Sequence, residues 1–240
     1  MEYGLQLYSI RDITGDDMAG SLKKVAALGY KFVEFAGFFG IPAADIAAML
    51  KENGLRVSGT HTGYQEVSER FDETAAYHKA IGNKNIIVPG CDLSTQDKID
   101  AFVEMANRFQ PLLAGQGITF GYHNHSHEFK PNADGSVIYD QLVERTALKL
   151  EIDTYWAFNA GLDPVALMEK LKDRVHVIHI KDGFMGGEGT PLGRGAAPVK
   201  AVWEKARQLG IPMVVESETL TPDGITEAAL CIEYLNALGA

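Results

Sequence analysis

The sequence predicts an α/β protein that folds as a single-domain (β/α)8 barrel, the TIM barrel architecture. Eight short β-rich segments alternate with segments of helical periodicity, with one unit about every 30 residues. The 240 residues, 46% of them hydrophobic, can bury one sizeable core. No linker or low-complexity tract interrupts the alternation, so residues 1–240 are expected to form one barrel domain.

The strands are expected where apolar and β-branched residues cluster, and the helices where apolar residues recur at i, i+3, i+4 and i+7. Two of the helices should stop at Gly29 and Gly54. The predicted strands are residues 3–9, 32–37, 56–62, 85–90, 118–125, 148–156, 175–182 and 213–218. The predicted helices are residues 18–29, 41–54, 95–117, 163–173, 199–210 and 226–239. The rival fold, an open doubly wound sheet, normally carries a glycine-rich phosphate loop after its first strand, and "IRDITGDD" contains none.

Composition restricts the partners and the compartment. The formal net charge of -10 makes nucleic acid and anionic membranes poor partners. Cys91 and Cys231 lie far apart and belong to no CxxC motif, which is typical of reduced thiols in a cytosolic protein. The start "MEYGLQLYS" has no signal-peptide pattern, so a cytoplasmic protein is expected.

Polar residues gather at the ends of six predicted strands. The active site of an α/β barrel lies at the C-terminal ends of its strands, so these residues indicate one shared site. A single buried histidine is more often a hydrogen-bonded core residue, but six strands that end this way are hard to explain by packing. The residues are Glu34, His61, His123, Asn124, His125, Glu151, Asp153, His179, Lys181, Asp182, Glu216 and Glu218.

A divalent cation is the simplest compensation for so many ionisable groups in one place. Four residues from four late strands are the best ligand candidates: His123, Asp153, His179 and Glu216. Glu128 is a fifth candidate, because the loop after His125 could return its carboxylate to the site. Mixed imidazole and carboxylate ligands suit Mn, Co, Zn, Fe or Mg rather than Ca or Cu(I). The alternative is a metal-free network of ion pairs and substrate hydrogen bonds.

Several motifs together resemble the xylose isomerase-like barrel superfamily, which includes sugar and sugar phosphate isomerases and epimerases, hydroxypyruvate isomerase, inosose dehydratase and endonuclease IV. The motifs are "GLQLYSIRD", "GYKFVEF", "YHNHSHEF", "EIDTYW", "HIKDG" and "VVESE", and they span essentially the whole chain. The combination is specific to the superfamily but not to one reaction.

The resemblance implies a metal held by Glu, Asp, His and Glu in the epimerase branch. Asp153 in "EIDT", His179 in "HIKD" and Glu216 in "VVES" match three of these ligands. Relatives have "LEN" at the end of strand five where this chain has "YHN", so His123 occupies the position of the first Glu. Either His123 replaces that ligand or Glu128 supplies the carboxylate. The change puts two-glutamate ketose 3-epimerisation in doubt.

Such a site suits proton removal next to a carbonyl, with the metal stabilising an enediolate. Glu216 is the leading acid/base by resemblance, and His123 or His125 is the second, because imidazole exchanges protons near neutral pH. Lys181 would stabilise an oxyanion or bind a phosphate as a point charge. The residues expected to bind substrate are Glu34, His61, Glu128, Trp156 and Arg194, the last when the glycine-rich loop 183–198 closes as a lid.

The expected function is a divalent-metal-dependent isomerase or epimerase of a small sugar, sugar phosphate or keto-acid, with Mn, Mg, Co or Zn as the metal. A lyase or dehydratase acting on a keto-sugar or keto-inositol is the alternative. An endonuclease IV-like DNA repair enzyme is a remote third, because the chain has only seven histidines and is acidic. A small carbohydrate is the expected partner, and a homodimer would be unsurprising.

Overall fold

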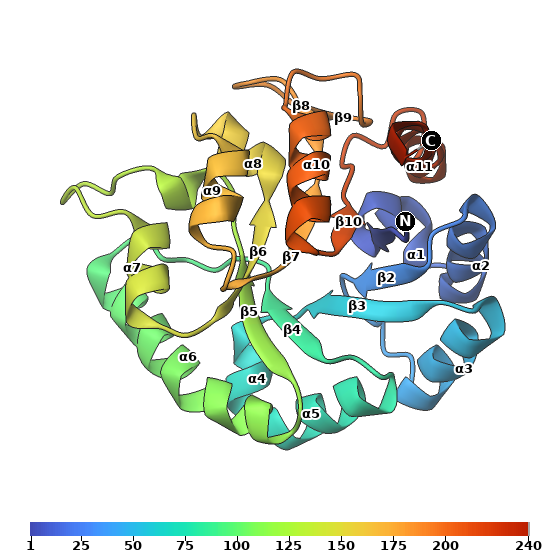
Figure 1. Cartoon of the computed structure of the whole chain (residues 1–240). Helices are drawn as coiled ribbons and strands as arrows, with labels where there is room; N and C mark the ends of the chain where they lie inside the picture. Colours follow the sequence, from blue (N-terminus) through green and yellow to red (C-terminus); the bar gives the residue numbers. More distant parts are fainter. Residues whose placement is uncertain (240) are drawn as a thin grey trace.

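The structure is a computed structural model that describes residues 1–239. Eight parallel strands form a closed barrel in the order β1-β10-β7-β6-β5-β4-β3-β2 (Figure 1), which confirms the predicted fold class. Because β1 pairs with both β2 and β10, the sheet has no free edge. The barrel strands are β1 (Gly4–Gln6), β2 (Phe32–Phe35), β3 (Arg56–His61), β4 (Asn85–Val88), β5 (Thr119–His123), β6 (Lys149–Asp153), β7 (Val175–Ile180) and β10 (Met213–Val215).

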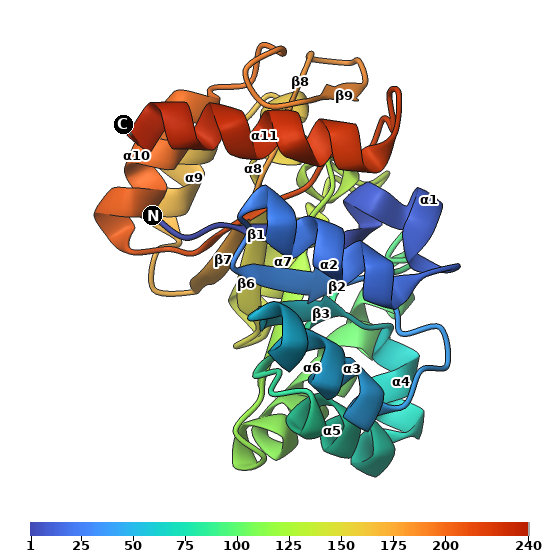
Figure 2. The same cartoon turned by 90° about the vertical axis from the view of Figure 1, so that its right-hand side faces the viewer.

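Helices surround the barrel, and all six predicted helices are present (Figure 1). Gly29 and Gly54 end α2 and α3 in the left-handed conformation, with φ of 101° and 63°, as their positions predict. The helix α11 packs on α2 and on the 3-10 turn η1 (Figure 2). The helices are α1 (Arg11–Thr14), α2 (Met18–Leu28), α3 (Ala43–Asn53), α4 (Tyr64–Glu69), α5 (Phe71–Ala80), α6 (Gln96–Gly115), α7 (Ile138–Arg145), α8 (Thr154–Asn159), α9 (Pro164–Lys170), α10 (Val199–Leu209) and α11 (Gly224–Gly239). Two 3-10 turns, η1 (Leu7–Ile10) and η2 (His127–Phe129), follow β1 and β5.

The predicted strands are mostly too long at their C-terminal ends. The prediction for residues 148–156 is wrong beyond Asp153, because Asp153 caps α8 by accepting a hydrogen bond from the Trp156 backbone N–H. Likewise β10 stops at Val215, one residue before Glu216. The helices α1, α4, α5, α7 and α8 were not predicted, because they are short or carry a weak apolar stripe.

The interior of the barrel is apolar only at its N-terminal end. Phe32, Ile87, Val177 and Val214 form a small cluster there, separate from the two large clusters that pack between the strands and the helices. Gly4 makes room for it, since a Cβ atom on Gly4 would lie 2.2 Å from the Phe32 ring. Toward the C-terminal end the buried strand residues include the ionisable side chains of Glu34, His123, Glu151, Asp153 and His179, so that end holds a polar site.

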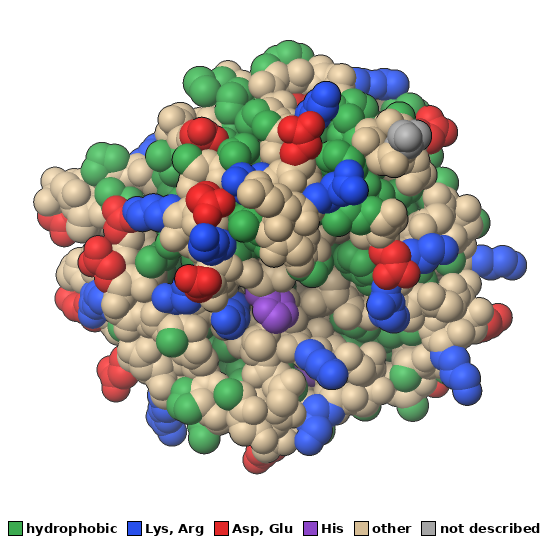
Figure 3. Space-filling view, viewed as in Figure 1, with side chains coloured by type: hydrophobic (Ala, Val, Ile, Leu, Met, Phe, Trp, Pro, Cys, Tyr) green, Lys and Arg blue, Asp and Glu red, His purple; other side chains and the backbone are tan. Residues whose placement is uncertain are grey.

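Acidic and basic side chains are interspersed on the face of the molecule shown in Figure 3. In the described part of the chain, no helix is long and apolar enough to cross a membrane. Cys91 and Cys231 are free, as predicted.

His78 should make the protein sensitive to acid. Its ring is buried in α5, where Nδ1 lies 2.9 Å from Asn83 Nδ2, and burial lowers its pKa to about 4. Below the ordinary histidine pKa of about 6.5, His78 is protonated in the unfolded chain but stays neutral in the folded protein. The free energy of unfolding therefore falls as the pH drops from about 6.5 toward 4. We expect this group to remove about 2–3 kcal/mol between pH 7 and pH 4.5. Urea unfolding of wild type and His78→Gln at both pH values measures it, and parallel pH profiles would contradict it.

Candidate active site

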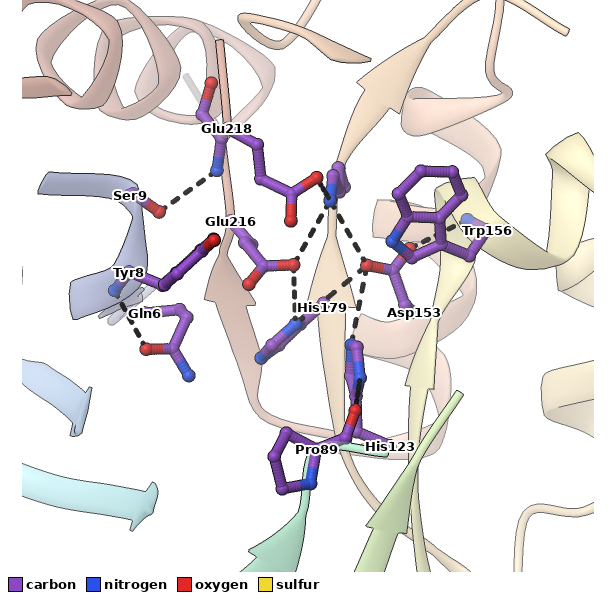
Figure 4. Close-up of polar contacts among 12 residues, drawn as sticks. Gln6, Tyr8, Ser9, Pro89, His123, Asp153, Trp156, His179, Glu216 and Glu218 are labelled. Carbon is purple, nitrogen blue, oxygen red and sulfur yellow. Dashed lines mark hydrogen bonds and ion pairs between the residues drawn. The ribbon is translucent and has the colours of Figure 1, made fainter. Parts of the chain in front are cut away.

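The four predicted metal ligands converge at the C-terminal end of the barrel. His123 ends β5, Asp153 ends β6, His179 lies in β7 and Glu216 follows β10, so they come from consecutive positions around the barrel. One ligand atom of each lies within 4.8 Å of the others, and all four residues are at most 4% exposed. Figure 4 shows these side chains pointing toward one another.

Two of these ligand atoms face each other without a hydrogen-bond partner. His123 Nε2 and Asp153 Oδ2 are buried and 3.6 Å apart. His123 Nδ1 lies 3.3 Å from the Pro89 carbonyl oxygen, which can only accept, so the ring proton belongs on Nδ1 and the lone pair on Nε2. Burial lowers the pKa of His123 to about 4, which keeps the imidazole neutral near pH 7. Two opposed buried acceptors fit a shared cation.

His179 is oriented from below by Glu34. Its Nε2 lies 2.9 Å from Glu34 Oε1, and its Nδ1 faces Glu216 Oε2 at 3.3 Å and Asp153 Oδ2 at 4.0 Å. Burial alone would lower the pKa of His179, but the carboxylates around it outweigh burial and raise it well above the ordinary value. A carboxylate behind a ligating histidine fixes the ring and selects the nitrogen that binds metal.

A second layer of charged residues lies beneath these four. Glu151 Oε2 is 2.7 Å from His61 Nε2, and Glu34 accepts a hydrogen bond of 2.6 Å from Gln6 Nε2 and lies 3.1 Å from His61. Burial and the charge of Glu34 raise the pKa of Glu151 to about 8. Against the effect of burial, the two carboxylates raise the pKa of His61 to about 9. The layer is thus a network of ion pairs. Such a network is what the alternative to a metal site proposed for these ionisable residues.

Lys181 is buried among carboxylates. Its Nζ lies 3.2 Å from Glu216 Oε2 and 3.8 Å from Asp153 Oδ2, and it donates a hydrogen bond to Glu218. Burial would lower the pKa of Lys181, but these three neighbours raise it. Lys181 in turn, with His179, lowers the pKa of Glu216 well below its usual range although burial opposes this. Lys181 therefore acts as an internal counter-charge that keeps Glu216 ionised.

The ligand cluster opens into a cavity of about 470 Å³, a volume that accommodates a small molecule. Two further cavities, of about 420 and 550 Å³, contact the residue pair Arg56 and His176 at the start of β3 and β7, at the opposite end of the barrel. The residues that line the first cavity are Tyr8, Ala36, His61, Pro89, Gly90, His123, His125, Glu216 and Glu218.

The family model described as "Xylose isomerase-like TIM barrel" matches residues 22–236. The chain belongs to this family. The crystal structure of a sugar phosphate isomerase/epimerase from Parabacteroides distasonis ATCC 8503 is similar to it with a TM-score of 0.86 and 27% identity, covering 98% of this chain and 97% of that chain. A structure of L-ribulose 3-epimerase has a TM-score of 0.75 at 14% identity, covers 99% of this chain and 94% of that one, and shows the fold alone.

A curated relative is the inosose dehydratase of Geobacillus kaustophilus (strain HTA426). It is 23% identical over 188 residues, which cover 67% of this chain and 60% of that protein. The match thus spans less than two thirds of the relative's length. The names of these similar proteins include an isomerase/epimerase, an epimerase and a dehydratase, so the similarity does not by itself select one reaction.

In this family member, Glu128 lies apart from the four candidate ligands. Its carboxylate accepts hydrogen bonds from Tyr122 Oη at 3.1 Å and from the His125 backbone N–H at 2.8 Å, and it groups with His125 and His127 instead. Of the two alternatives for the first ligand, the geometry therefore favours His123. Glu128 orders the loop after β5, which carries His125 to the cavity wall.

Four of the five predicted substrate-binding residues do not line the cavity: Glu128, described above, and Glu34, Trp156 and Arg194. Glu34 is fully buried beneath the ligands, so its contacts are with protein atoms. The Trp156 ring lies behind the wall, 4.8 Å from Lys181 Nζ. Arg194 is exposed on the glycine-rich loop. His61 does line the cavity, as predicted, with 10% of its side chain exposed.

The glycine-rich loop is more ordered than expected of a free lid. It forms a hairpin of β8 (Asp182–Gly183) and β9 (Gly189–Thr190). The Asp182 carboxylate accepts backbone N–H groups from both ends of the loop, and Tyr155 Oη donates to the carbonyl of Gly187 at 2.8 Å. Phe184 and Met185 project from its tip and are 50% and 59% exposed. Closure over substrate remains a prediction, confined to this tip.

Sequence reasoning missed three residues near the mouth. Gln6 holds Glu34, Tyr8 lines the cavity, and Ser9 Oγ accepts the backbone N–H of Ser217 at 3.0 Å (Figure 4). The available signal was the polar Gln6 near the end of the first strand. Gln6, Tyr8 and Ser9 are not charged, so they do not indicate a metal or catalytic site as the ionisable residues of the other strands do.

Glu34→Gln should weaken metal binding without removing it. The variant loses the negative charge that orients His179 but keeps a side chain of similar size. Mutation of a residue that hydrogen-bonds a metal-binding histidine typically lowers metal affinity by about 10–100-fold. Competition with a chelator of known affinity measures the change, with Glu73→Gln, an exposed glutamate in α5, as the control. Unchanged affinity in Glu34→Gln would contradict the orienting role.

Proposed function

We propose that this protein is a divalent-metal-dependent isomerase or epimerase that moves a proton next to the carbonyl of a small sugar-like substrate. The observation that carries the proposal is the convergence of His123, Asp153, His179 and Glu216, with two opposed unpartnered acceptor atoms, beside a cavity of about 470 Å³. The names of the family members, which include a sugar phosphate isomerase/epimerase, support it.

The four side chains would hold the metal through two imidazole nitrogens and two carboxylates, a donor set that suits Mn, Mg, Co or Zn. The bound ion would supply Lewis acidity, which polarises the substrate carbonyl and makes the neighbouring C–H more acidic. Glu34 and the Pro89 carbonyl would keep the two imidazoles in the orientation that this requires.

Glu216 is the proposed proton acceptor. It lines the cavity and is kept ionised by Lys181, so it can take a proton from the substrate carbon. His125 is the proposed second acid/base on the cavity wall, with 38% of its side chain exposed and its Nδ1 facing Glu128 Oε1 at 3.8 Å, beyond hydrogen-bond distance. His61 completes that wall and can hydrogen-bond a substrate hydroxyl.

A lyase or dehydratase is the second candidate, because the curated relative is named an inosose dehydratase. Both reactions start with removal of the same proton, and His125 would then protonate the leaving hydroxyl instead of a carbon. Incubation of metal-loaded enzyme with ketoses and cyclic keto-polyols in D2O separates them. An isomerase or epimerase gives an isomer of the substrate in which solvent deuterium replaces the transferred hydrogen, whereas a dehydratase gives a product that has lost one molecule of water. Equal turnover by metal-stripped enzyme would overturn the proposal.

His123→Glu should keep the metal and favour epimerisation. Glutamate restores the second carboxylate of the epimerase pair and makes the site one charge more negative. We expect the ratio of epimerised to isomerised product to rise about tenfold, as measured by chromatography of the sugars. His123→Gln, which adds no charge, is the control and should not shift the ratio.

A further inference from the structure

We propose that the substrate is an uncharged keto-sugar or keto-polyol and not a phosphate ester. This inference rests on the proposed function and narrows it. It follows from how the chain uses the groups around the cavity that would otherwise bind an anion.

The cavity wall carries carboxylates and no lysine or arginine. Among the nine described residues that line it, Glu216 and Glu218 are the acidic ones, and neither an ammonium nor a guanidinium group is present. Lys181 lies behind them and is already neutralised by its three carboxylate neighbours. The two imidazoles on this wall that are not candidate metal ligands already face carboxylates, His61 those of Glu34 and Glu151 and His125 that of Glu128. A phosphate in this cavity would therefore lie beside Glu218 and find no side-chain cation free to compensate its charge, which is unfavourable.

In the glycine-rich loop after β7, a carboxylate of the protein itself, that of Asp182, occupies the position where the backbone N–H groups could bind a phosphate. Loops in this part of a TIM barrel often cradle a phosphate with backbone N–H groups. Here the buried Asp182 carboxylate accepts the N–H groups of Gly183, Gly193, Gly195 and Ala197 at 2.8–3.1 Å. A Cβ atom on Gly195 would lie 2.3 Å from Asp182 Oδ1, so the carboxylate occupies this nest closely. The N–H donors are therefore not available to a substrate anion.

The loop after β10 shows the same arrangement. The buried Glu227 accepts the N–H of Thr221 at 3.0 Å, and Asp12 accepts the N–H of Gly224, the first residue of α11, at 3.3 Å. Asp223 accepts the N–H of Thr226 at 2.8 Å. An incoming phosphate would meet these carboxylates in place of free N–H groups.

Arg11, which contacts the loop after β10, and Arg194, which lies in the loop after β7, do not offset this. Arg11 donates to the carbonyl oxygens of Tyr8 at 3.0 Å and Glu218 at 2.7 Å, and thus holds the loop that carries Glu218. Arg194 is exposed and its neighbours in the loop are fixed to Asp182. Hydroxyl groups, in contrast, suit this wall, because Glu218 can accept hydrogen bonds from them and the imidazoles of His61 and His125 can donate hydrogen bonds to them.

The test compares matched substrates on the Mn-loaded enzyme: a 2-ketohexose with its 6-phosphate, a 2-ketopentose with its 5-phosphate, and a cyclic keto-polyol with its phosphate. We expect kcat/KM to be at least about 100-fold higher for the free member of the pair that reacts. An equal or higher value for the phosphate would overturn the inference while leaving the proposed function intact. If neither member of any pair reacts, the proposed function fails, and calorimetric Kd values for the same pairs then decide the inference by the same criterion.

A variant tests the electrostatic cause. Glu218→Gln removes one negative charge from the wall, so the preference for the free sugar should narrow about tenfold. Glu188→Gln, on the tip of the glycine-rich loop and outside the cavity lining, should leave the preference unchanged. An unchanged preference in Glu218→Gln would contradict the assignment of Glu218 as the group that excludes anions.

Discussion

Asp153→Asn should abolish tight binding of a divalent metal and lower kcat/KM by about 1000-fold or more. Asp153 Oδ2 faces His123 Nε2, His179 Nδ1 and Lys181 Nζ, so it lies at the centre of the ligand cluster. Asparagine preserves the shape and the N-cap of α8 but removes the charge that a metal requires. Elemental analysis of folded protein and steady-state kinetics measure the two effects.

The matched control is Glu128→Gln. Glu128 is another buried carboxylate near the end of β5, but it groups with His125 and His127. It should retain full metal content, whereas Asp153→Asn should not. Metal content preserved in Asp153→Asn and lost in Glu128→Gln would move the metal to the other carboxylate and leave His123 free as an acid/base.

Glu216→Gln should lower kcat by about 10²–10⁴-fold while most of the metal stays bound. The amide oxygen can still coordinate, but the amide cannot accept the proton that the carboxylate takes from the substrate carbon. Exchange of the substrate C–H with deuterium from solvent, followed by NMR, should disappear in parallel with turnover. Retained exchange with lost turnover would show that another residue removes the proton.

The fold was predictable because its determinants are local. The alternation of strands and helices follows from the hydrophobic periodicity of each short segment, and glycines such as Gly29 and Gly54 lie where helices end. The four candidate ligands were predictable for a related reason. Parallel strands end at the same rim, so His123, Asp153, His179 and Glu216 had to lie together once the barrel closed.

The rest of the site depends on contacts between distant segments. Glu34 ends a strand like the other candidates, yet its carboxylate turns down to His179, which is 145 residues away in sequence. The carboxylate of Asp182 accepts hydrogen bonds from the backbone of the glycine-rich loop that follows it. Lys181 forms ion pairs with Glu216 and Glu218. A strand-end position thus predicts proximity to the site, but hydrogen-bond partners decide which residues face a substrate.

Anomalous diffraction from crystals grown with Mn tests the central claim most directly. We expect one strong peak bounded by His123 Nε2, Asp153 Oδ2, His179 Nδ1 and Glu216, next to the cavity. A peak beside Glu128, His125 and His127 would contradict the assignment of the four metal ligands. A peak in the layer beneath them, between His61 and Glu151, would contradict it too.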